Sequence, residues 1–522
     1  MLLDFPILSL LLLFPLLAAV ATYVVGRVTN NDRAAKWTGI GLSMFPLALS
    51  TLLVLGFVTD FSWFSFNEHT VTGPANRAWT YQAWESVEWI PDLNVTYLLG
   101  VDGLSVFLVF LTTLLTPLAL AVSWGEQHRA KEFFALFLFM ETTILGVFLS
   151  LDFFLFFLFW EAGLVPMYFL IAVWGGPRKR YAAIKFFLFT QAASLLVLLG
   201  IFALYFYGGN TFDMTQLIAI GGGIPVGVIQ NFVFIAFLIG FGTKLPTFPL
   251  HTWLPDAHVE APTGGSVMLA GILLKLGGYG LFRVNVQMLP DAAVELAWLV
   301  AALGIVSILY GAVVCIAQED LKRLVAYSSV SHMGFVTLGV AIGVWGAHAL
   351  GADAPGILTG YSGGVFQLFA HGLISAALFM VAGSLGHNLG TRNVSELGGI
   401  AKRTPQLTMF LMIAFLASLG LPGLVGFIAE LTVFIGTYAV FGWWVAIPML
   451  SVVLTAAYYL WAAQRAMFGP LNPRWKDAHD AHAYDLVPLA VLTALFALFG
   501  LFGYAFFSVI QDWGRASLGV FG

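Results

Sequence analysis

Five ionisable residues lie within long apolar runs of this 522-residue chain. Glu161, Lys275 and His371 each stand near the middle of a run, in FFLFFLFWEAGLVPMYFLI, VMLAGILLKLGGYGLF and VFQLFAHGLISAALFM. Lys244 and Glu430 stand in runs that proline and glycine interrupt. A central Lys or Asp costs roughly 2.5 to 3.5 kcal/mol on insertion scales, so such residues face a bundle interior or a wet cavity. Glu, Lys and His exchange protons when burial shifts their proton affinities, which predicts a proton path.

The Glu161 carboxylate and the Lys244 ammonium are expected to act as a switch. When the two ions associate, both stay charged, and when they part the lysine can release its proton along the membrane. The alternative is a set of fixed salt bridges that only hold the helices together. The residues alone leave both interpretations open.

Four further residues are secondary candidates. Glu141, in LFLFMETTILG, is expected to be buried and could belong to a subsidiary path. His332, in SSVSHMGF, could relay protons or make a polar contact near a helix start. His251 and His258 flank the joint HTWLPDAHVEAP, where a place at a mouth or turn is as reasonable as a relay.

The elements that position these residues are membrane helices. The composition is 60% hydrophobic and 9% charged, whereas soluble domains carry about 25% charged residues. Runs long enough to span a bilayer recur along the chain. They predict an all-α protein of about fourteen transmembrane helices. The first helix is expected to be retained rather than cleaved as a signal peptide. The expected helices lie near residues 5–26, 37–58, 100–123, 133–150, 152–174, 183–207, 226–250, 262–285, 295–316, 323–345, 358–385, 405–438, 443–464 and 485–511.

The basic residues predict the orientation, because cytoplasmic joints carry an excess of Lys and Arg. Of the 22 Lys and Arg residues, three fall on one face (Arg77, Arg283 and Arg515) and Lys244 and Lys275 fall inside apolar runs. The other seventeen fall on the opposite joints: Arg27, Arg33, Lys36, Arg129, Lys131, Arg178, Lys179, Arg180, Lys185, Lys322, Arg323, Arg392, Lys402, Arg403, Arg465, Arg474 and Lys476. Both termini are therefore expected to face outward. The long outer joint, about 59–99, is rich in Trp and acidic residues and is interpreted as an interfacial cap.

Two runs are broken in a way that ordinary spanning helices are not. The seventh contains GFGTKLPTFPLH and the twelfth contains SLGLPGLVGFIAE. Proline removes a backbone donor and clashes with the preceding turn, so each run is expected to be two half-helices around an unwound segment. Broken helices at matching places point to the transport site of a repeat-built transporter. The alternative is that both breaks are simple kinks. The two predicted repeats are inverted five-helix units at 133–285 and 295–464. Residues 1–132 precede them with three helices and the outer loop, and residues 465–522 follow with the inner joint and the last helix.

Redox chemistry is not expected on this chain. One cysteine, Cys315, excludes an intramolecular disulfide, an iron-sulfur cluster and a thiolate zinc site. No Walker or dinucleotide glycine motif occurs in a strand-to-helix context. No cofactor or metal site is therefore predicted.

Five strings resemble the antiporter-like subunits of bacterial NADH-quinone oxidoreductase, which is respiratory complex I. They are LLGVDGLSVFLVFLTTLLTPL, FFLFWEAGLVPMYFLIAVWG, HTWLPDAHVEAPTGGSVMLAGILLKLGGYGLFR, QEDLKRLVAYSSVSHMGFV and LPGLVGFIAE. The resemblance runs from about residue 95 to 470, and the third string is close to diagnostic for the M type. The L type is similar but has a lysine at the Glu430 place and a long lateral helix, whereas this chain ends about ten residues past its predicted last span.

This resemblance implies a fourteen-helix fold with inverted repeats and a central hydrophilic axis. It assigns the essential glutamate to Glu161, the broken-helix lysine to Lys244, the bridging lysine to Lys275, the relay histidine to His371 and the terminal glutamate to Glu430. It also implies a bacterial inner membrane location, L-like and N-like partner subunits, and FMN, iron-sulfur clusters and quinone on partners. The alternatives are a D-type subunit of a multisubunit cation/proton antiporter or membrane-bound hydrogenase, and a scaffold without transport.

The distribution of basic residues gives a testable topology. Cysteines introduced at Arg178 and Trp475 should react with impermeant thiol reagents only from the cytoplasmic side, and one at Arg77 only from outside. Labelling of the Arg77 and Arg178 positions from the same side would show that the helix count is wrong.

Overall fold

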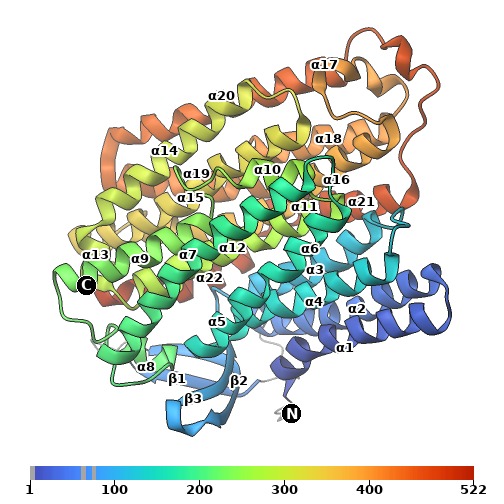
Figure 1. Cartoon of the computed structure of the whole chain (residues 1–522). Coiled ribbons are helices and arrows are strands. Elements are labelled where there is room, and N and C mark those ends of the chain that lie inside the picture. The colour runs from blue at the N-terminus through green and yellow to red at the C-terminus, as the bar shows by residue number, and fades with distance from the viewer. Residues whose placement is uncertain (1–5, 60–65, 73–77, 522) are drawn as a thin grey trace.

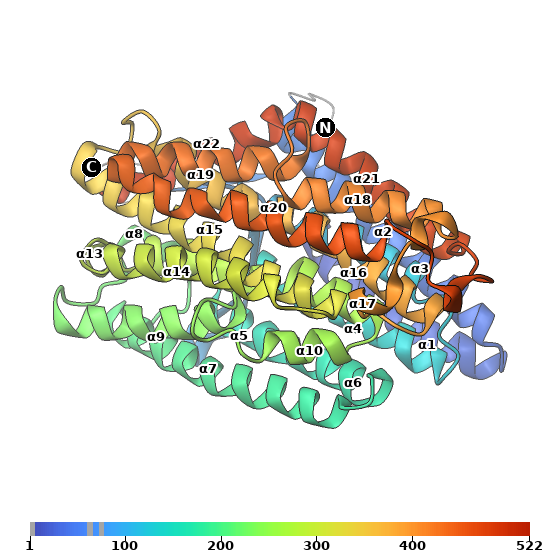
Figure 2. The same cartoon turned by 90° about the horizontal axis from the view of Figure 1, so that it is seen from above.

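The protein is a multi-span helical membrane protein. The computed structural model describes residues 6–59, 66–72 and 78–521. Within them, eleven helical segments are long and apolar enough to cross a membrane, and three shorter apolar helices accompany them: Val106–Val122, Val228–Lys244 and Pro405–Ser418. Figure 1 shows the long helices side by side with similar directions and a small sheet at one end, and Figure 2 shows the same bundle from above.

The helices have the following bounds in chain order. Those before residue 296 are α1 (Ile7–Val28), α2 (Asp32–Val58), α3 (Val106–Val122), α4 (Ala130–Leu149), α5 (Phe153–Ala162), α6 (Leu164–Trp174), α7 (Lys179–Tyr207), α8 (Met214–Ala219), α9 (Val228–Lys244), α10 (Leu254–Glu260), α11 (Thr263–Met268), the π-helix η3 (Leu269–Leu273), α12 (Leu274–Gly280), the π-helix η4 (Leu281–Val286) and α13 (Pro290–Glu295). Those after it are α14 (Ala297–Ile316), α15 (Leu321–Leu350), α16 (Ile357–Leu389), α17 (Val394–Leu397), α18 (Pro405–Ser418), α19 (Val425–Phe441), α20 (Ala446–Ala466), α21 (Ala483–Phe502) and α22 (Tyr504–Leu518). Short 3-10 turns are η2 (Pro91–Leu93), η5 (Ile400–Lys402), η6 (Gly442–Val445), η7 (Pro473–Trp475) and η8 (Gly519–Phe521).

The joint at about 59–99, expected to be an interfacial cap, forms a sheet in its described residues, so the all-α expectation is wrong there. β1 (Glu68–Thr72), β2 (Ala78–Ile90) and β3 (Val95–Val101) form a three-stranded antiparallel sheet in that order. In β2 the side chains of Trp79, Tyr81 and Ala83 are buried and alternate with less buried neighbours. This period of two is typical of a strand with one packed face. Arg77, which the topology prediction uses, lies outside the described residues.

Both helix breaks fall where the proline and glycine patterns predict them. α9 ends at Lys244 and α10 begins at Leu254, while α18 ends at Ser418 and α19 begins at Val425. In the first break, Trp253 Nε1 donates to Thr243 O at 2.9 Å and Phe248 N donates to Ser307 Oγ at 2.9 Å. Such side-chain bonds satisfy backbone groups that an unwound segment frees inside a membrane. The predicted cytoplasmic joint at residues 251–262 is largely this second half-helix, α10.

The last predicted helix, 485–511, is wrong in its second part. The spanning helix α21 ends at Phe502, and α22 starts at Tyr504. The α22 segment buries Phe507, Ile510 and Trp513 and exposes polar residues on its other side. An amphipathic helix of this kind suits an interface better than a hydrocarbon core.

Glycines allow α15, α16 and α19 to touch backbone to backbone. A Cβ added at Gly339 would lie 2.7 Å from Gly364 Cα, and one added at Gly360 would lie 2.6 Å from Gly436 Cα. Small residues at helix crossings permit such close packing in membranes. Consequently, three helices that are distant in sequence present their side chains to one another.

Two segments form the centre of the bundle. The α16 helix and the Thr263–Val286 segment, which comprises α11, η3, α12 and η4, are buried throughout their apolar windows. Their buried polar side chains therefore face other helices rather than lipid. These two segments carry His371 and Lys275.

We expect Gly360→Ala to destabilise the bundle, because its new methyl group would collide with Gly436. Overpacking of this kind costs about 1 to 3 kcal/mol. The measurement is the temperature at which the detergent-solubilised protein loses its native state. Gly41→Ala is the matched control, since a Cβ there meets nothing within 4 Å among the described residues, and equal melting of the two variants would contradict the packing argument.

Candidate functional site

Lys275 and His371 form the centre of the site. Lys275 Nζ lies 2.8 Å from His371 Nδ1 and also donates to Ala270 O, and both side chains are buried. The π-helical turn η3 contains Ala270, and π turns leave backbone carbonyls outside the regular α pattern. Either the ammonium donates to the imidazole, or a neutral amine accepts from it. One geometry therefore accommodates the proton on either residue.

His332 and Glu430 continue the line from His371. The His332 and His371 rings have centroids 5.8 Å apart, and His332 Nδ1 lies 2.9 Å from Glu430 Oε1. His332 Nε2 lies 3.0 Å from Ser418 Oγ, which is 2.8 Å from Tyr459 Oη. These hydroxyls fix the imidazole between His371 and Glu430. The structure therefore places His332, only a secondary candidate by sequence, inside the line.

Lys244 is not joined to Glu161 in this structure. Lys244 Nζ donates to Trp160 O at 3.2 Å and lies 3.5 Å from the centroid of the Trp160 ring, a cation–π contact. Within the described part of the chain, buried Glu161 Oε1 has no hydrogen-bond partner. Glu161 also lines an apolar cavity of about 830 Å³ formed mainly by phenylalanines. The expected association of Glu161 with Lys244 is therefore not among the contacts of the described residues, and the switch stays a prediction.

The line has a gap between Lys244 and Lys275. No hydrogen bond between these two side chains occurs in the described ranges; each amine is occupied by other acceptors. Their helices nevertheless touch, because a Cβ at Gly277 would collide with Phe241 O and Leu245 N. The site therefore consists of two parts, Glu161 with Lys244 and the series Lys275, His371, His332 and Glu430.

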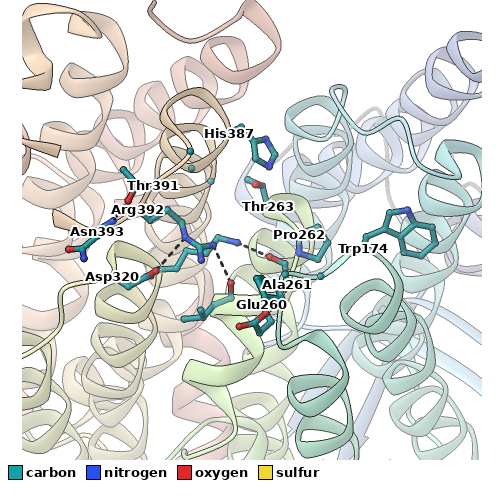
Figure 3. Close-up of a pocket in the computed structure, with 18 residues that line it drawn as sticks. Trp174, Glu260, Ala261, Pro262, Thr263, Asp320, His387, Thr391, Arg392 and Asn393 are labelled. Atoms are coloured by element: carbon teal, nitrogen blue, oxygen red, sulfur yellow. Dashed lines mark hydrogen bonds and ion pairs between the residues drawn. The ribbon is translucent and has the colours of Figure 1, made fainter. Parts of the chain in front are cut away.

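A cavity of about 480 Å³ lies at the basic end of the bundle, between the α6–α7 joint, α10 and the ends of α15 and α16. Figure 3 shows Arg392 reaching Asp320, with Ala261, Pro262 and Thr263 beside them. The buried Lys322 ammonium donates to Ala261 O at 2.7 Å. The cavity thus brings polar groups to the Thr263 end of the segment that carries Lys275.

The remaining secondary candidates are buried rather than exposed at a mouth. The His258 ring stacks on Phe379 at 4.2 Å, and neither ring nitrogen has a hydrogen-bond partner among the residues described. His251 packs between Phe248 and Tyr310 in the break. Both Glu141 carboxylate oxygens are buried without a hydrogen-bond partner in the described part of α4 and its surroundings. None of the three is directly bonded to the series from Lys275 to Glu430.

An ion pair that sequence reasoning missed lies nearby. Arg283, expected on an outer joint, is buried in η4 and contacts Asp102 through Nη2 and Oδ2 at 2.7 Å. Its position eight residues after Lys275 in the same apolar run was the available signal. Within the residues described, no group of three or more His, Cys, Asp or Glu is placed to hold a metal ion.

The sequence is similar to those of known membrane subunits. The family model described as NADH:quinone oxidoreductase/Mrp antiporter, TM matches residues 150–455. The F(420)H(2) dehydrogenase subunit M of Methanosarcina mazei is 43% identical over 91% of this chain and 90% of its own length. NADH-quinone oxidoreductase subunit M of Rhodobacter capsulatus is 40% identical over 89% of this chain and 87% of its own length.

Solved structures agree in fold. A chain in respiratory complex I from Thermus thermophilus with bound NADH superposes with a TM-score of 0.85 and 28% identity, covering 99% of this chain and 100% of that one. A chain of the Mrp complex from Dietzia sp. DQ12-45-1b gives a TM-score of 0.79 at 23% identity, covering 98% of this chain and 52% of that one. The second likeness shows the fold alone.

The gap between Lys244 and Lys275 predicts internal water. Because each buried amine needs polar surroundings, we expect ordered waters between Lys244 and Lys275 and along the line to His371 and Glu430. A high-resolution density map of the assembled protein measures this directly. Dry apolar packing around Lys275 would leave a static polar cluster and remove the path.

Proposed function

Because the chain belongs to the family of transmembrane subunits shared by NADH:quinone oxidoreductases and Mrp antiporters, we propose that it is the M-type proton-translocating subunit in the membrane arm of a respiratory NADH-quinone oxidoreductase. The observation that carries the proposal is the series of neighbouring side chains Lys275, His371, His332 and Glu430, in which the two outer pairs are in direct contact and the two imidazoles lie 5.8 Å apart. Each of these groups can bind and release a proton. Such a series in the middle of a membrane protein marks an ion route rather than a surface feature.

Proton movement along the series needs only small changes. The two nitrogens that share a proton in the Lys275–His371 contact lie 2.8 Å apart, and the nitrogen and oxygen of the His332–Glu430 contact lie 2.9 Å apart, so each proton transfer follows a hydrogen bond that already exists. Between the two imidazoles, a water molecule or a ring rotation must complete the connection, because the rings do not share a hydrogen bond. The α19 segment carries Glu430 beyond the second break, so we assign Glu430 as the exit.

Glu161 and Lys244 supply the control of this movement in our proposal. The two lie close together, because Lys244 Nζ donates to the carbonyl of Trp160, the residue before Glu161, but they are separated here. An approaching carboxylate would stabilise the Lys244 ammonium, and its withdrawal would favour release of the proton toward Lys275. The driving force comes from redox chemistry elsewhere, with FMN, iron-sulfur clusters and quinone on partner subunits.

The finer architecture is part of the same proposal. We assign fourteen spanning segments by counting the two broken helices as one segment each, with inverted five-helix units at 133–285 and 295–464. The broken helices α9–α10 and α18–α19 occupy equivalent places in these units. Both termini face outward in the bacterial inner membrane, and the neighbours are L-like and N-like subunits.

The second candidates differ in what drives the transport. The 43% identical relative is named as a subunit of an F(420)H(2) dehydrogenase, and a D-type subunit of an Mrp antiporter or membrane-bound hydrogenase shares the fold. Identifying the subunits that co-purify decides among these. Recovery of a flavin-containing NADH-binding subunit supports the NADH assignment, whereas an F420H2-oxidising subunit or no redox subunit excludes it.

Glu161→Gln tests the function. Gln keeps the size of Glu but cannot ionise, so Lys244 loses the partner that stabilises its charge. We expect normal assembly, loss of most quinone reduction and coupled pumping, and near-normal electron transfer from NADH to a soluble artificial acceptor. Glu161→Asp should retain more activity than Gln because the charge survives.

The matched control is Glu132→Gln. Glu132 is a partly exposed carboxylate on α4 that pairs with Arg129 at 3.7 Å. The substitution therefore removes a carboxylate charge outside the series from Lys275 to Glu430. It should leave quinone reduction and pumping unchanged. Full coupled turnover in assembled Glu161→Gln membranes would make Glu161 a structural residue and defeat the switch.

A further inference from the structure

A second polar line runs along the helical segment that carries Lys275. Lys275, Tyr279, Arg283 and Gln287 follow one another at every fourth position. Arg283 Nε donates to Tyr279 Oη at 3.2 Å, and Nη1 donates to Gln287 Oε1 at 3.2 Å. In a regular α-helix, a spacing of four drifts around the axis because a turn holds 3.6 residues. The wider π-helical turn η4 offsets this drift and keeps the side chains on one face.

This line leads from the central lysine toward the end of the bundle where the sheet lies. Gln287 follows η4, and Tyr81 of β2 lies 5.7 Å from the Arg283 guanidinium. Tyr279 flanks the guanidinium at 5.3 Å. If every member could pass a proton, the line would connect Lys275 with the outer side and bypass Glu430.

Arg283 interrupts that connection. A hydrogen-bonded chain carries protons only if each member both accepts and donates, and a guanidinium has five N–H donors, no acceptor and a permanent proton. The Arg283 side chain is 1% exposed. It donates to Tyr279 on one side and to Gln287 on the other, so no proton can pass through it in either direction.

Asp102 holds the guanidinium in this place. The Asp102 carboxylate contacts Arg283 Nη2 at 2.7 Å, and its other oxygen accepts from Leu104 N at 3.2 Å and Ser105 N at 3.1 Å at the start of α3. The carboxylate is thereby fixed to the backbone. A fully buried, charge-assisted contact of this kind is among the stronger ones that proteins make.

We propose that Arg283, anchored by Asp102, is a proton seal that prevents protons on Lys275 from leaking directly to the outer side of the membrane. The inference rests on the proposed function, because a seal matters only if Lys275 carries protons. It assigns Arg283 no part in the forward transfer. The alternative is that the ion pair has a structural role only and stabilises the packing of the sheet and α3 against the bundle.

Two double variants separate these possibilities. Arg283→Gln with Asp102→Asn removes both charges and inserts two amide side chains. Each amide oxygen accepts hydrogen bonds, and the smaller Gln side chain leaves room for water. Arg283→Met with Asp102→Leu removes both charges and leaves an apolar plug. Neither variant leaves a buried charge unpaired, which would by itself be strongly destabilising. The assembled complex is reconstituted in liposomes, and the collapse of an imposed pH gradient is followed without electron donor.

The amide pair should collapse the gradient several-fold faster than wild type, and the apolar pair should hold it as wild type does. Equal rates of gradient collapse for the amide pair and wild type would overturn the seal. Equal leakage through the amide pair and the apolar pair would also overturn it, because disturbed packing alone would then explain the leak. If the amide pair does not assemble, Arg283→His with Asp102 retained gives the same test, since an imidazole both accepts and donates protons. An Arg283→His complex that holds the pH gradient as wild type does would likewise overturn the seal.

The origin of the leak is checked by adding Lys275→Met to the leaking variant. The leak should fall to the wild-type rate if it starts at Lys275. A persisting leak refutes the seal on this lysine but says nothing about turnover-driven pumping. The Glu161→Gln test of the proposed function depends on turnover, so the two failures are distinguishable.

Discussion

Hydrocarbon supplies no hydrogen-bond partners, so each buried polar group of this bundle must find them within the chain or in trapped water. The way in which this constraint is met divides the ionisable residues that pair inside the bundle into two classes. Arg283 pairs with Asp102, a cation that keeps its proton with an anion fixed by backbone donors. Lys275 pairs with His371, and His332 with Glu430, so both members of each pair can exchange a proton. The first kind of pair is static, and the second kind can conduct.

The backbone makes these pairs possible. Close contacts at Gly339 and Gly360 bring α15, α16 and α19 together, which is why His332, His371 and Glu430 become neighbours. The π-helical turn η3 before α12 provides Ala270 O as an acceptor for Lys275. The π-helical turn η4 after α12 places Arg283 on the same face as Lys275. Irregular turns and small residues are costly elsewhere, but here they supply polar groups and proximity that a regular helix surface would not.

The sequence predicted the local features of this structure better than the tertiary ones. Proline and glycine locate both breaks, because a missing donor acts on its own turn. Burial of Lys275 and His371 followed from the length of their apolar runs. The His332 to Glu430 contact depends on helix crossings that no local pattern records, and the separation of Lys244 from Glu161 depends on a side-chain orientation toward Trp160. Hydrophobic content does not predict the sheet, because the signal of β2 is an alternation of buried and less buried side chains rather than a long apolar run.

Directional transport needs a closed route as much as an open one. In the proposed function, His371 and His332 can accept protons from the direction of Lys275, while the line toward the sheet meets a guanidinium that cannot. On the other side, Lys244 and Lys275 have no direct bond among the described residues, although α9 and α12 touch at Gly277. Within the proposed function, control therefore belongs at that gap, where water or a side-chain movement must complete the connection, and the remaining series to Glu430 needs to be only a passive conductor.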